Sequence, residues 1–332
     1  MHALQEIIQG SLPAAVVVLV ISFAVLAKCA NLFVDSSIEL ANKFKVPRLV
    51  IGLVLVSLAT TSPELAVSLM SALKGLPEMA LGNAIGSVIC DDGLALALCG
   101  IFAPAAIAIN PRLLKSTGAV LAFVCALSFL FIIFDRPPTL SRIEGSVLIA
   151  VFVAYTVYLY RQHKKGVIVE DNALVDVSHN VRSLWVDVAL FVVGIGGILI
   201  TSEFIITSAE CIAIKFGVPE TVVALVLVAF GTSMPEIATC VVAARKNEGA
   251  LAVGNILGAD IMNICWVAGA SAIANDLTVA RADALFMFPW MFVIVATMLI
   301  LLRIGYSFNR PKGIIMLVLY LVYLASFFIA LR

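Results

Sequence analysis

Two glutamates, Glu64 and Glu236, each follow a proline near the middle of a long apolar stretch. Proline has no N–H to donate, so Pro63 and Pro235 each leave a main-chain carbonyl one turn earlier without its helical partner. Each kink therefore gathers a carboxylate, a freed carbonyl and two hydroxyls within about one helical turn. The hydroxyls belong to Thr60, Thr61, Thr232 and Ser233. These donors are all hard oxygens, which suit Ca2+ and Na+ and not soft transition metals.

A second polar set stands on the apolar stretch that follows each kink. Asn83, Ser87 and Asp91 recur every four residues, so they share one face of a helix. Their counterparts further along the chain are Asn255, Ala259 and Asn263. Asp91 and Asn263 fall about halfway along their stretches, level with the glutamates. Small residues spaced for close helix packing stand beside them: Gly82, Gly86, Gly254 and Gly258.

The surroundings of these polar residues are a lipid bilayer. The 332 residues are 62% hydrophobic and 13% charged, whereas soluble proteins carry about 25% charged residues. Ten stretches approach or exceed the roughly 20 apolar residues that cross a bilayer. They are Ser11–Phe33, Val46–Ala72, Met79–Pro104, Leu113–Phe134, Ile143–Tyr160, Trp185–Ser208, Val218–Ala244, Ala250–Ala274, Ala284–Leu302 and Ile314–Leu331. A carboxylate at the centre of such a helix costs about 2.5–3.5 kcal/mol, so it needs a partner or a function.

The chain repeats itself with an offset of 172 residues. Between Phe44–Asp92 and Phe216–Ile264, 19 of 49 residues are identical without a gap. Each half holds five predicted spans, an odd number, so the halves insert with opposite orientation. We therefore predict an all-α membrane protein of ten transmembrane helices in two inverted five-helix repeats. The repeats are residues 1–160, with motifs at 57–92, and 185–332, with motifs at 229–264; residues 161–184 form a cytoplasmic linker.

Basic residues indicate the orientation. With the N-terminus outside, 14 Lys and Arg residues fall on the inward loops and 6 on the outward side, as the positive-inside rule favours. Both termini are thus expected outside the cytoplasm. The three histidines lie outside the spans, and the seven cysteines stand in or next to apolar stretches, so we expect no cofactor, no histidine-dependent catalysis and no nucleic-acid binding.

At these motifs the sequence resembles the cation/Ca2+ exchanger superfamily, in particular its prokaryotic sodium/calcium exchanger branch. That family carries a G-T-S-x-P-E motif and a G-N-x-x-G-S-N-I-x-[ND] motif in each inverted repeat. Here the first motif reads ATTSPE (59–64) and GTSMPE (231–236), and the second reads GNAIGSVICD (82–91) and GNILGADIMN (254–263). The resemblance implies antiport of Ca2+ against Na+ at overlapping central sites, by alternating access, in a secondary transporter that is not an enzyme. It also implies the inner membrane of a prokaryotic cell.

The resemblance also implies a role for each motif residue. Glu64 and Glu236 would be ligands shared by both ions, and Thr60 and Thr232 would supply oxygens for Ca2+. The Na+ sites would use Thr61, Ser233, Ser87 and the main-chain carbonyls of Ser57 and Ala229. The sequence departs from the family where Asp91 and Asn263 exchange the usual Asn and Asp, and where Ala259 lacks the hydroxyl of Ser87. Asp92 and Asp260 are additional buried acids, and Asp260 lies roughly on the face of Asn263.

Other functions stay open on the sequence alone. Several acids at the bilayer midplane could bind protons, as in a Ca2+/H+ exchanger, and a K+-dependent exchanger would carry similar residues. An intramembrane aspartyl protease needs two facing aspartates, whereas the repeat places Asp91 opposite Asn263. A structural hydrogen-bond cluster and a channel are further alternatives. Hydroxyl and amide oxygens coordinate ions without titrating, which favours Na+ as the counter-ion of Ca2+.

Overall fold

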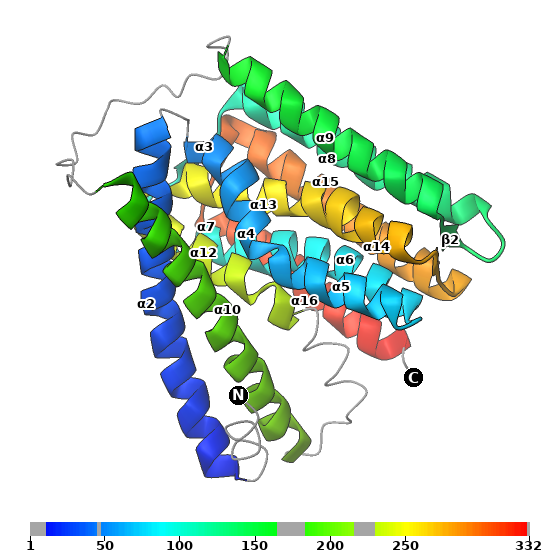
Figure 1. Ribbon diagram of the computed structural model, residues 1–332, viewed down its shortest axis with the longest axis horizontal. Helices are drawn as coiled ribbons and strands as arrows, with labels where there is room; N and C mark the ends of the chain where they lie inside the picture. Colours follow the sequence, from blue (N-terminus) through cyan, green and yellow to red (C-terminus); the bar gives the residue numbers. More distant parts are fainter. Residues whose placement is uncertain (1–10, 45–47, 165–182, 216–229, 331–332) are drawn as a thin grey trace.

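The computed structural model describes residues 11–44, 48–164, 183–215 and 230–330, and these are almost entirely helical (Figure 1). The first half contains α2 (Leu12–Phe44), α3 (Arg48–Ile51), η1 (Gly52–Val56), α4 (Ser57–Thr60), α5 (Ser62–Leu73), α6 (Pro77–Cys90), η2 (Asp91–Ala95), α7 (Leu96–Phe102), β1 (Ile107–Ala108), α8 (Pro111–Phe134), β2 (Thr139–Leu140) and α9 (Arg142–Lys164). The second half contains α10 (Leu184–Lys215), α12 (Met234–Arg245), α13 (Gly249–Met262), η3 (Asn263–Ala268), α14 (Gly269–Ala274), β3 (Leu277–Thr278), α15 (Arg281–Arg303), η4 (Ile304–Tyr306), β4 (Ser307–Phe308) and α16 (Arg310–Ala330).

The second span is broken near its middle. The axis of α5 is bent by 52° from that of Gly52–Thr60. Thr61, between them, has φ −80° and ψ 1°, and Pro63 stands in the first turn of α5, where a missing N–H is tolerated. Ser233 has almost the same dihedral angles, φ −81° and ψ 2°, directly before α12, and Pro235 stands in its first turn. Both prolines therefore begin the second part of a broken helix, as the kink motif predicts.

The third and eighth spans share an interruption that the hydrophobic pattern does not predict. α6 changes to the π-helical segment η2 at Asp91, and α13 changes to the π-helical segment η3 at Asn263. The two residues are one repeat offset apart (263 − 91 = 172). π-Helical turns within α-helices occur frequently at functional sites. The interruption thus marks the same motif residue in both halves.

Four two-residue strands lie in the loops between helices. β1 pairs antiparallel with β4, with Ile107 opposite Phe308, and β2 pairs antiparallel with β3, with Thr139 opposite Thr278. Each ladder therefore joins a loop of the first half to a loop of the second. β1 and β3 lie in the loops after the third and eighth spans, and β2 and β4 lie in the loops after the fourth and ninth spans. Each ladder therefore pairs one loop of each kind, as expected when two similar halves are related by a two-fold axis.

α2 and α10 are longer than the apolar stretches that predicted them. They contain 33 and 32 residues and continue to Phe44 and Lys215, beyond the expected ends at Phe33 and Ser208. At 1.5 Å per residue each is about 50 Å long, which exceeds the roughly 30 Å hydrocarbon layer. The extension of α2 contains several polar residues, which the apolar stretch excluded, whereas the extension of α10 reads AECIAIK and contains only two charged residues, Glu210 and Lys215. Figure 1 shows the two helices side by side, at a steep angle to the other long helices.

The contact between α2 and α10 is close and antiparallel. A Cβ on Gly194 would lie 2.9 Å from the backbone of Phe33, whose ring centroid is 4.6 Å from that of Phe191. Lys43 near the end of α2 forms an ion pair with the buried Asp187 near the start of α10. The pair of helices is therefore fixed along its length by apolar packing and at one end by charge.

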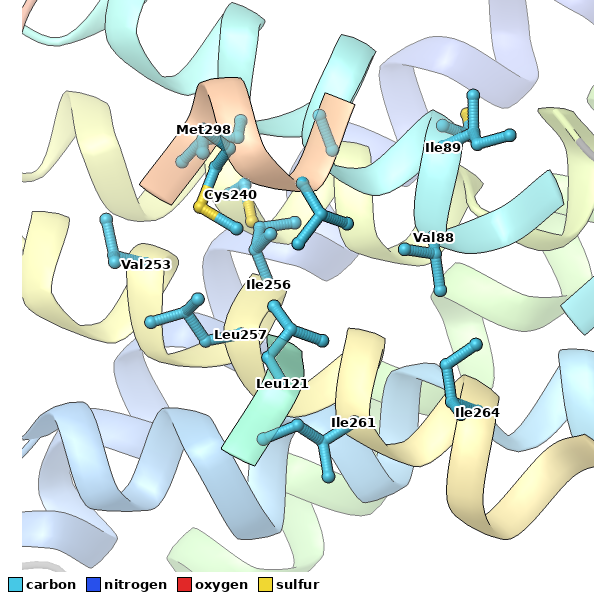
Figure 2. Packing of buried hydrophobic residues seen from close by; sticks show 14 of the residues in the cluster. Val88, Ile89, Leu121, Cys240, Val253, Ile256, Leu257, Ile261, Ile264 and Met298 are labelled. Atoms are coloured by element: carbon cyan, nitrogen blue, oxygen red, sulfur yellow. The ribbon is translucent and has the colours of Figure 1, made fainter. Parts of the chain in front are cut away.

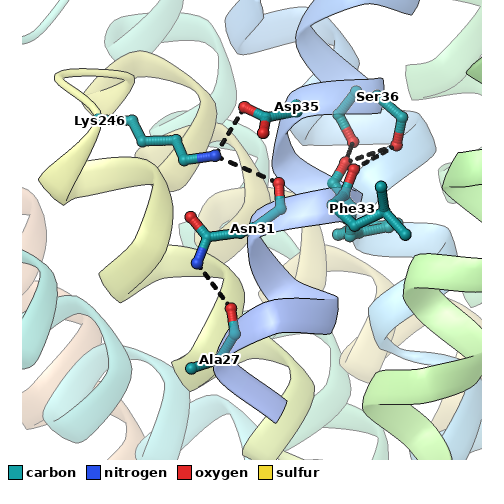
Figure 3. Close-up of polar contacts among 8 residues, drawn as sticks. Ala27, Asn31, Phe33, Asp35, Ser36 and Lys246 are labelled. Atoms are coloured by element: carbon teal, nitrogen blue, oxygen red, sulfur yellow. Dashed lines mark hydrogen bonds and ion pairs between the residues drawn. The ribbon is translucent and has the colours of Figure 1, made fainter. Parts of the chain in front are cut away.

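A polar contact links α2 to the end of α12. The Lys246 ammonium lies 2.6 Å from a carboxylate oxygen of Asp35 and donates to the carbonyl of Asn31 at 3.2 Å (Figure 3). Lys246 caps α12, the second part of the span that carries Glu236. The contact connects the α2–α10 pair to the motif helices through one partly exposed and one exposed side chain.

The number of spans is nine within the described residues. Eight helices are long and apolar enough to cross a membrane, and the bent second span is the ninth. The span predicted over 218–244 is not among these nine, because residues 218–229 lie outside the described part. A total of ten spans therefore stays a prediction. α9 extends to Lys164, so the first residues of the linker expected at 161–184 are helical; residues 165–182 are also outside the described part.

Candidate ion-binding site

Three carboxylates and one amide lie buried where the broken spans meet the π-helical segments. Glu64, Glu236, Asp91 and Asn263 are all fully buried. They come from α5, α12, η2 and η3 and so from both halves of the chain. Among the described residues, no Lys or Arg forms an ion pair with any of these carboxylates. Their negative charge therefore requires a cation, or protons, from elsewhere.

Hydrogen bonds across the halves hold this group together. Asn263 donates from Nδ2 to Oδ2 of Asp91, its repeat partner, at 3.4 Å. The Thr61 hydroxyl donates to Oε1 of Glu236 at 3.4 Å. Both bonds join one repeat to the other, as the sequence predicts for two motif pairs facing one centre. Both are also long, so they leave the acceptor oxygens weakly engaged.

Many oxygens in the group have no hydrogen-bond partner in the part of the chain that the structure describes. Buried polar atoms in proteins are almost always paired, so each exception calls for an explanation. The oxygens are both carboxylate oxygens of Glu64, Oε2 of Glu236, Oδ1 of Asp91, Oδ1 of Asn263 and the hydroxyls of Ser87 and Ser233. All seven are hard oxygens, which are the kind of ligand that Ca2+ takes.

No three His, Cys, Asp or Glu side chains among the described residues are close enough to hold a metal ion by themselves. A cation at this place would therefore take part of its coordination from hydroxyl, amide and main-chain oxygens. Such mixed oxygen sets suit Ca2+ and Na+ and exclude soft metals.

The remaining predicted ligands differ in the hydrogen bonds and neighbours that they already have. The Ser57 carbonyl already accepts the Thr61 N–H at 2.8 Å, and its hydroxyl donates to Leu53. Thr60 and Thr232 are buried, and each lies next to the glutamate of the other repeat, Thr60 next to Glu236 and Thr232 next to Glu64. Ala229 lies outside the described residues.

Asp260 has a different neighbour from the one that the sequence suggested. It lies within electrostatic reach of Asp91 and Glu236, but its carboxyl group faces that of Asp92. Both acids are fully buried, and their carboxyl groups lie within hydrogen-bonding reach of each other, with no other hydrogen-bond partner for either one within the described residues. Asp92, turned away from Asp91 on its helix, is thus paired with Asp260 in a second acidic group beside the first.

Glycine permits the close packing that closes the site. A Cβ on Gly258 would lie 2.4 Å from the carbonyl oxygen of Leu53, and one on Gly52 would lie 2.5 Å from that of Leu251. Of the glycines expected to do this, Gly258 is confirmed, whereas Gly82 has only a methionine sulfur at 3.9 Å and does not permit a close approach. On the other side of α13, buried apolar side chains lie among those of α8 and α15 (Figure 2).

Sequence reasoning missed a role for two amides of the predicted stripes. Asn83 and Asn255 form hydrogen bonds to threonines of the opposite repeat and are not among the oxygens without partners. The four-residue spacing placed them on the right face, but only the tertiary structure shows which hydroxyl each one meets.

The fold and the site define a class: a multi-pass helical membrane protein with a buried, oxygen-lined, acidic centre. The sodium/calcium exchanger protein family matches residues 14–161 and 186–329, most of the chain. The chain belongs to this family, and so to the secondary transporters and not to the enzymes.

Relatives and solved structures agree with the family. An uncharacterized membrane protein of Methanocaldococcus jannaschii is 31% identical over 89% of this chain and 91% of its own length. The sodium/calcium exchanger MaX1 of Methanosarcina acetivorans is 28% identical over 94% of this chain and 97% of its own. A structure of the sodium-calcium exchanger NCX_Mj, soaked with 2.5 mM Na+ and 0.1 mM Ca2+, matches with a TM-score of 0.78 at 27% identity, covering 94% of this chain and 98% of that one.

Proposed function

We propose that this chain exchanges Ca2+ for Na+ by alternating access, with both ions binding at the buried centre described above. The observation that carries the proposal is the set of buried oxygens without partners around Glu64 and Glu236. The proposed ligands are Glu64, Glu236, Asp91, Asn263, Thr60, Thr232, Thr61, Ser233, Ser87 and the carbonyls of Ser57 and Ala229, with Asp260 close by. The transported ions are substrates, and no cofactor is part of the proposal.

Charge balance explains why the two ions would be coupled. With Glu64, Glu236 and Asp91 ionised, the centre offers about three negative charges to one Ca2+ or to several Na+. Without a cation these charges are uncompensated in a medium of low dielectric constant, which disfavours a change of conformation. Either set of ions relieves the penalty, so the protein would cross between its inward-open and outward-open states only when it is loaded.

The long α2–α10 pair is the element that we propose to move. It lies at an angle to the helices that carry the motifs and is joined to the end of α12 by the exposed Lys246–Asp35 contact. An exposed ion pair contributes only about 0–1 kcal/mol, so breaking it would not obstruct a sliding motion.

Protons are the second candidate for the counter-ion. The observation that favours them is the buried pair of Asp92 and Asp260, whose facing carboxyl groups have no basic partner among the described residues. Sodium is preferred because hydroxyl and amide oxygens at the main centre coordinate ions and do not titrate.

The proposed setting is the inner membrane of a prokaryotic cell, with both termini outside the cytoplasm and residues 161–184 facing inward. The basis is the 14-to-6 distribution of basic residues. The partners proposed are the two ions and the lipid bilayer.

Uptake into proteoliposomes tests the proposal. An outward Na+ gradient should drive uptake of radioactive Ca2+ while an ionophore collapses the pH gradient. Vesicles without protein and vesicles with equal Na+ on both sides are the controls, and a K+ gradient is tested separately. Uptake that follows only the pH gradient would identify a Ca2+/H+ exchanger, and uptake that needs K+ a K+-dependent one.

A further inference from the structure

Two hydrogen bonds of the same kind cross between the repeats beside the proposed site. The Thr60 hydroxyl donates to Oδ1 of Asn255 at 3.1 Å, and the Thr232 hydroxyl donates to Oδ1 of Asn83 at 3.3 Å. Thr60 and Thr232 are one repeat offset apart, as are Asn83 and Asn255 (232 − 60 = 172; 255 − 83 = 172). The arrangement is therefore present twice, with different neighbouring residues, in one molecule.

Each amide is held so that its oxygen faces the threonine. Nδ2 of Asn83 donates to the Ser68 hydroxyl at 2.9 Å and to the Glu64 carbonyl at 3.3 Å. Nδ2 of Asn255 donates to the Cys240 sulfur at 3.7 Å. Ser68 and Cys240 are again repeat partners (240 − 68 = 172). Because the NH2 group of each amide donates to these partners, its Oδ1 atom is directed to the threonine hydroxyl.

The direction of the hydroxyl hydrogen decides whether a threonine can bind a cation. A hydroxyl has one hydrogen and two lone pairs, and a cation ligand must present a lone pair with its hydrogen pointing elsewhere. The Thr60 hydroxyl is also within hydrogen-bonding reach of the Glu236 carboxylate, and the Thr232 hydroxyl of that of Glu64. If the carboxylate were the acceptor, the threonine and the glutamate would form a hydrogen bond to each other, and both oxygens would be less available to the ion.

The amide also spares a main-chain carbonyl. Thr60 has a second acceptor within reach, the Ser57 carbonyl at 3.3 Å, which already accepts the Thr61 N–H. Asn255 is the nearer acceptor, at 3.1 Å. By taking the hydrogen, it leaves the Ser57 carbonyl with the Thr61 N–H as its donor and one lone pair for a cation.

We infer that Asn83 and Asn255 are positioning residues that work across the repeats: each amide accepts the hydrogen of the opposite repeat's threonine, so that the threonine and the adjacent glutamate both turn oxygen lone pairs to the cation. The inference rests on the proposed function, since it concerns the same site. It assigns neither amide as an ion ligand.

A double-mutant cycle tests the pairing. The variants are Asn255→Leu, Thr60→Val and their combination, with Ca2+ affinity measured by isothermal titration on purified protein. Each single change should weaken Ca2+ binding by about tenfold or less, as expected for one hydrogen bond. The double variant should bind Ca2+ as tightly as Thr60→Val alone. Once the hydroxyl is absent, the amide has no hydroxyl to orient and its removal should not change the affinity further. Asn83→Leu with Thr232→Val should behave in the same way.

The mismatched pairs are the control. Asn83→Leu with Thr60→Val, and Asn255→Leu with Thr232→Val, combine residues that share no hydrogen bond, so their effects should multiply. The inference would be overturned if the losses of Ca2+ affinity multiplied in the matched pairs. It would also be overturned if all four double variants lost less affinity than the product of their single losses, and by the same factor. The thermal midpoint of each purified variant shows whether it is folded, and Ala replaces Leu in the cycles if a Leu variant is not.

The outcome is separable from that of the proposed function. If Glu64→Gln abolishes Ca2+ binding while the matched cycles are multiplicative, the site stands and the positioning role is wrong. If Glu64→Gln binds and exchanges ions normally, the proposed site itself is wrong.

Discussion

At the scale of single residues, the two glutamates have the strongest claim to a function. Each is fully buried in the first turn of a helix that begins at a break, and neither has a basic partner among the described residues. Both have oxygens without hydrogen-bond partners within that part of the chain. A structural hydrogen-bond cluster would have paired these atoms, since an unpaired buried acceptor costs about 1–3 kcal/mol.

Replacing either glutamate should stop exchange. Glu64→Gln or Glu236→Gln removes a charge that both ions would use, and losing one partner of a buried charged contact costs about 2–5 kcal/mol. Ca2+ affinity should fall by about thirtyfold or more in each variant, and Na+-driven Ca2+ uptake should disappear. The matched control is the exposed Glu78→Gln, which should retain normal uptake. Normal uptake by Glu64→Gln or Glu236→Gln would contradict the assignment.

Asp91 should decide the preference between ions more than the ability to bind them. Asp91→Asn makes both repeats alike at this position and keeps an oxygen but removes a charge. Coulomb energy scales with the charge of the ion, so a tenfold loss of Ca2+ affinity would accompany a loss of only about threefold for Na+. Isothermal titration with each ion measures the two losses. An unchanged Ca2+ affinity, or equal losses for both ions, would show that Asp91 does not tune selectivity.

At the scale of helices, the α2–α10 pair packs more extensively within itself than against α12, which carries Glu236. Its two members are bound to each other by glycine packing and by the Lys43–Asp187 ion pair. Its polar contact with the end of α12, by contrast, uses exposed groups. The internal contact of the pair is thus the more extensive, which fits movement of the pair as one body.

Cross-linking tests whether the pair moves against α12. In a Cys29→Ala background, where the six other cysteines are buried, a short bifunctional thiol reagent on Asp35→Cys with Lys246→Cys joins α2 to the end of α12 and should abolish exchange. The two single variants, Asp35→Cys and Lys246→Cys, cannot form the bridge and should keep exchange after the same treatment. The hypothesis fails if the bridge has no effect or if the single variants are blocked to the same extent.

At the scale of the whole molecule, the inverted repeat organises both the site and the loops. The Asn263–Asp91 bond joins repeat partners, and each strand ladder joins loops of opposite halves. Contacts of this kind recur in pairs because two similar halves face one another across a common centre. The site therefore belongs to neither half alone.

The inverted arrangement also makes a prediction about topology. A cysteine introduced at position 332 should react with an impermeant thiol reagent added to intact cells, whereas one introduced at His163 should react only after the membrane is opened. The reason is the excess of basic residues on the side of residue 163. Labelling at 163 from outside, with none at 332, would reverse the orientation and both assignments of the termini.

The sequence by itself determined the membrane class, the repeat, the helix breaks and the identity of the buried polar residues. It could do so because each of these rests on local chemistry: apolar length, proline's missing N–H, and the cost of a charge in hydrocarbon. It also predicted that Asp91 would face Asn263, because a two-fold relation between halves places equivalent residues opposite each other.

The tertiary structure alone decided three other features. The helices α2 and α10 continue beyond the apolar stretches that predicted them, and hydropathy does not record where a helix ends. Asp92 and Asp260 face each other although they are not repeat partners, since side-chain direction depends on how the third and eighth spans cross. The pairing of Asn255 with Thr60 and of Asn83 with Thr232 joins residues 195 and 149 positions apart. No local pattern encodes such contacts, because they exist only once the two halves have packed together.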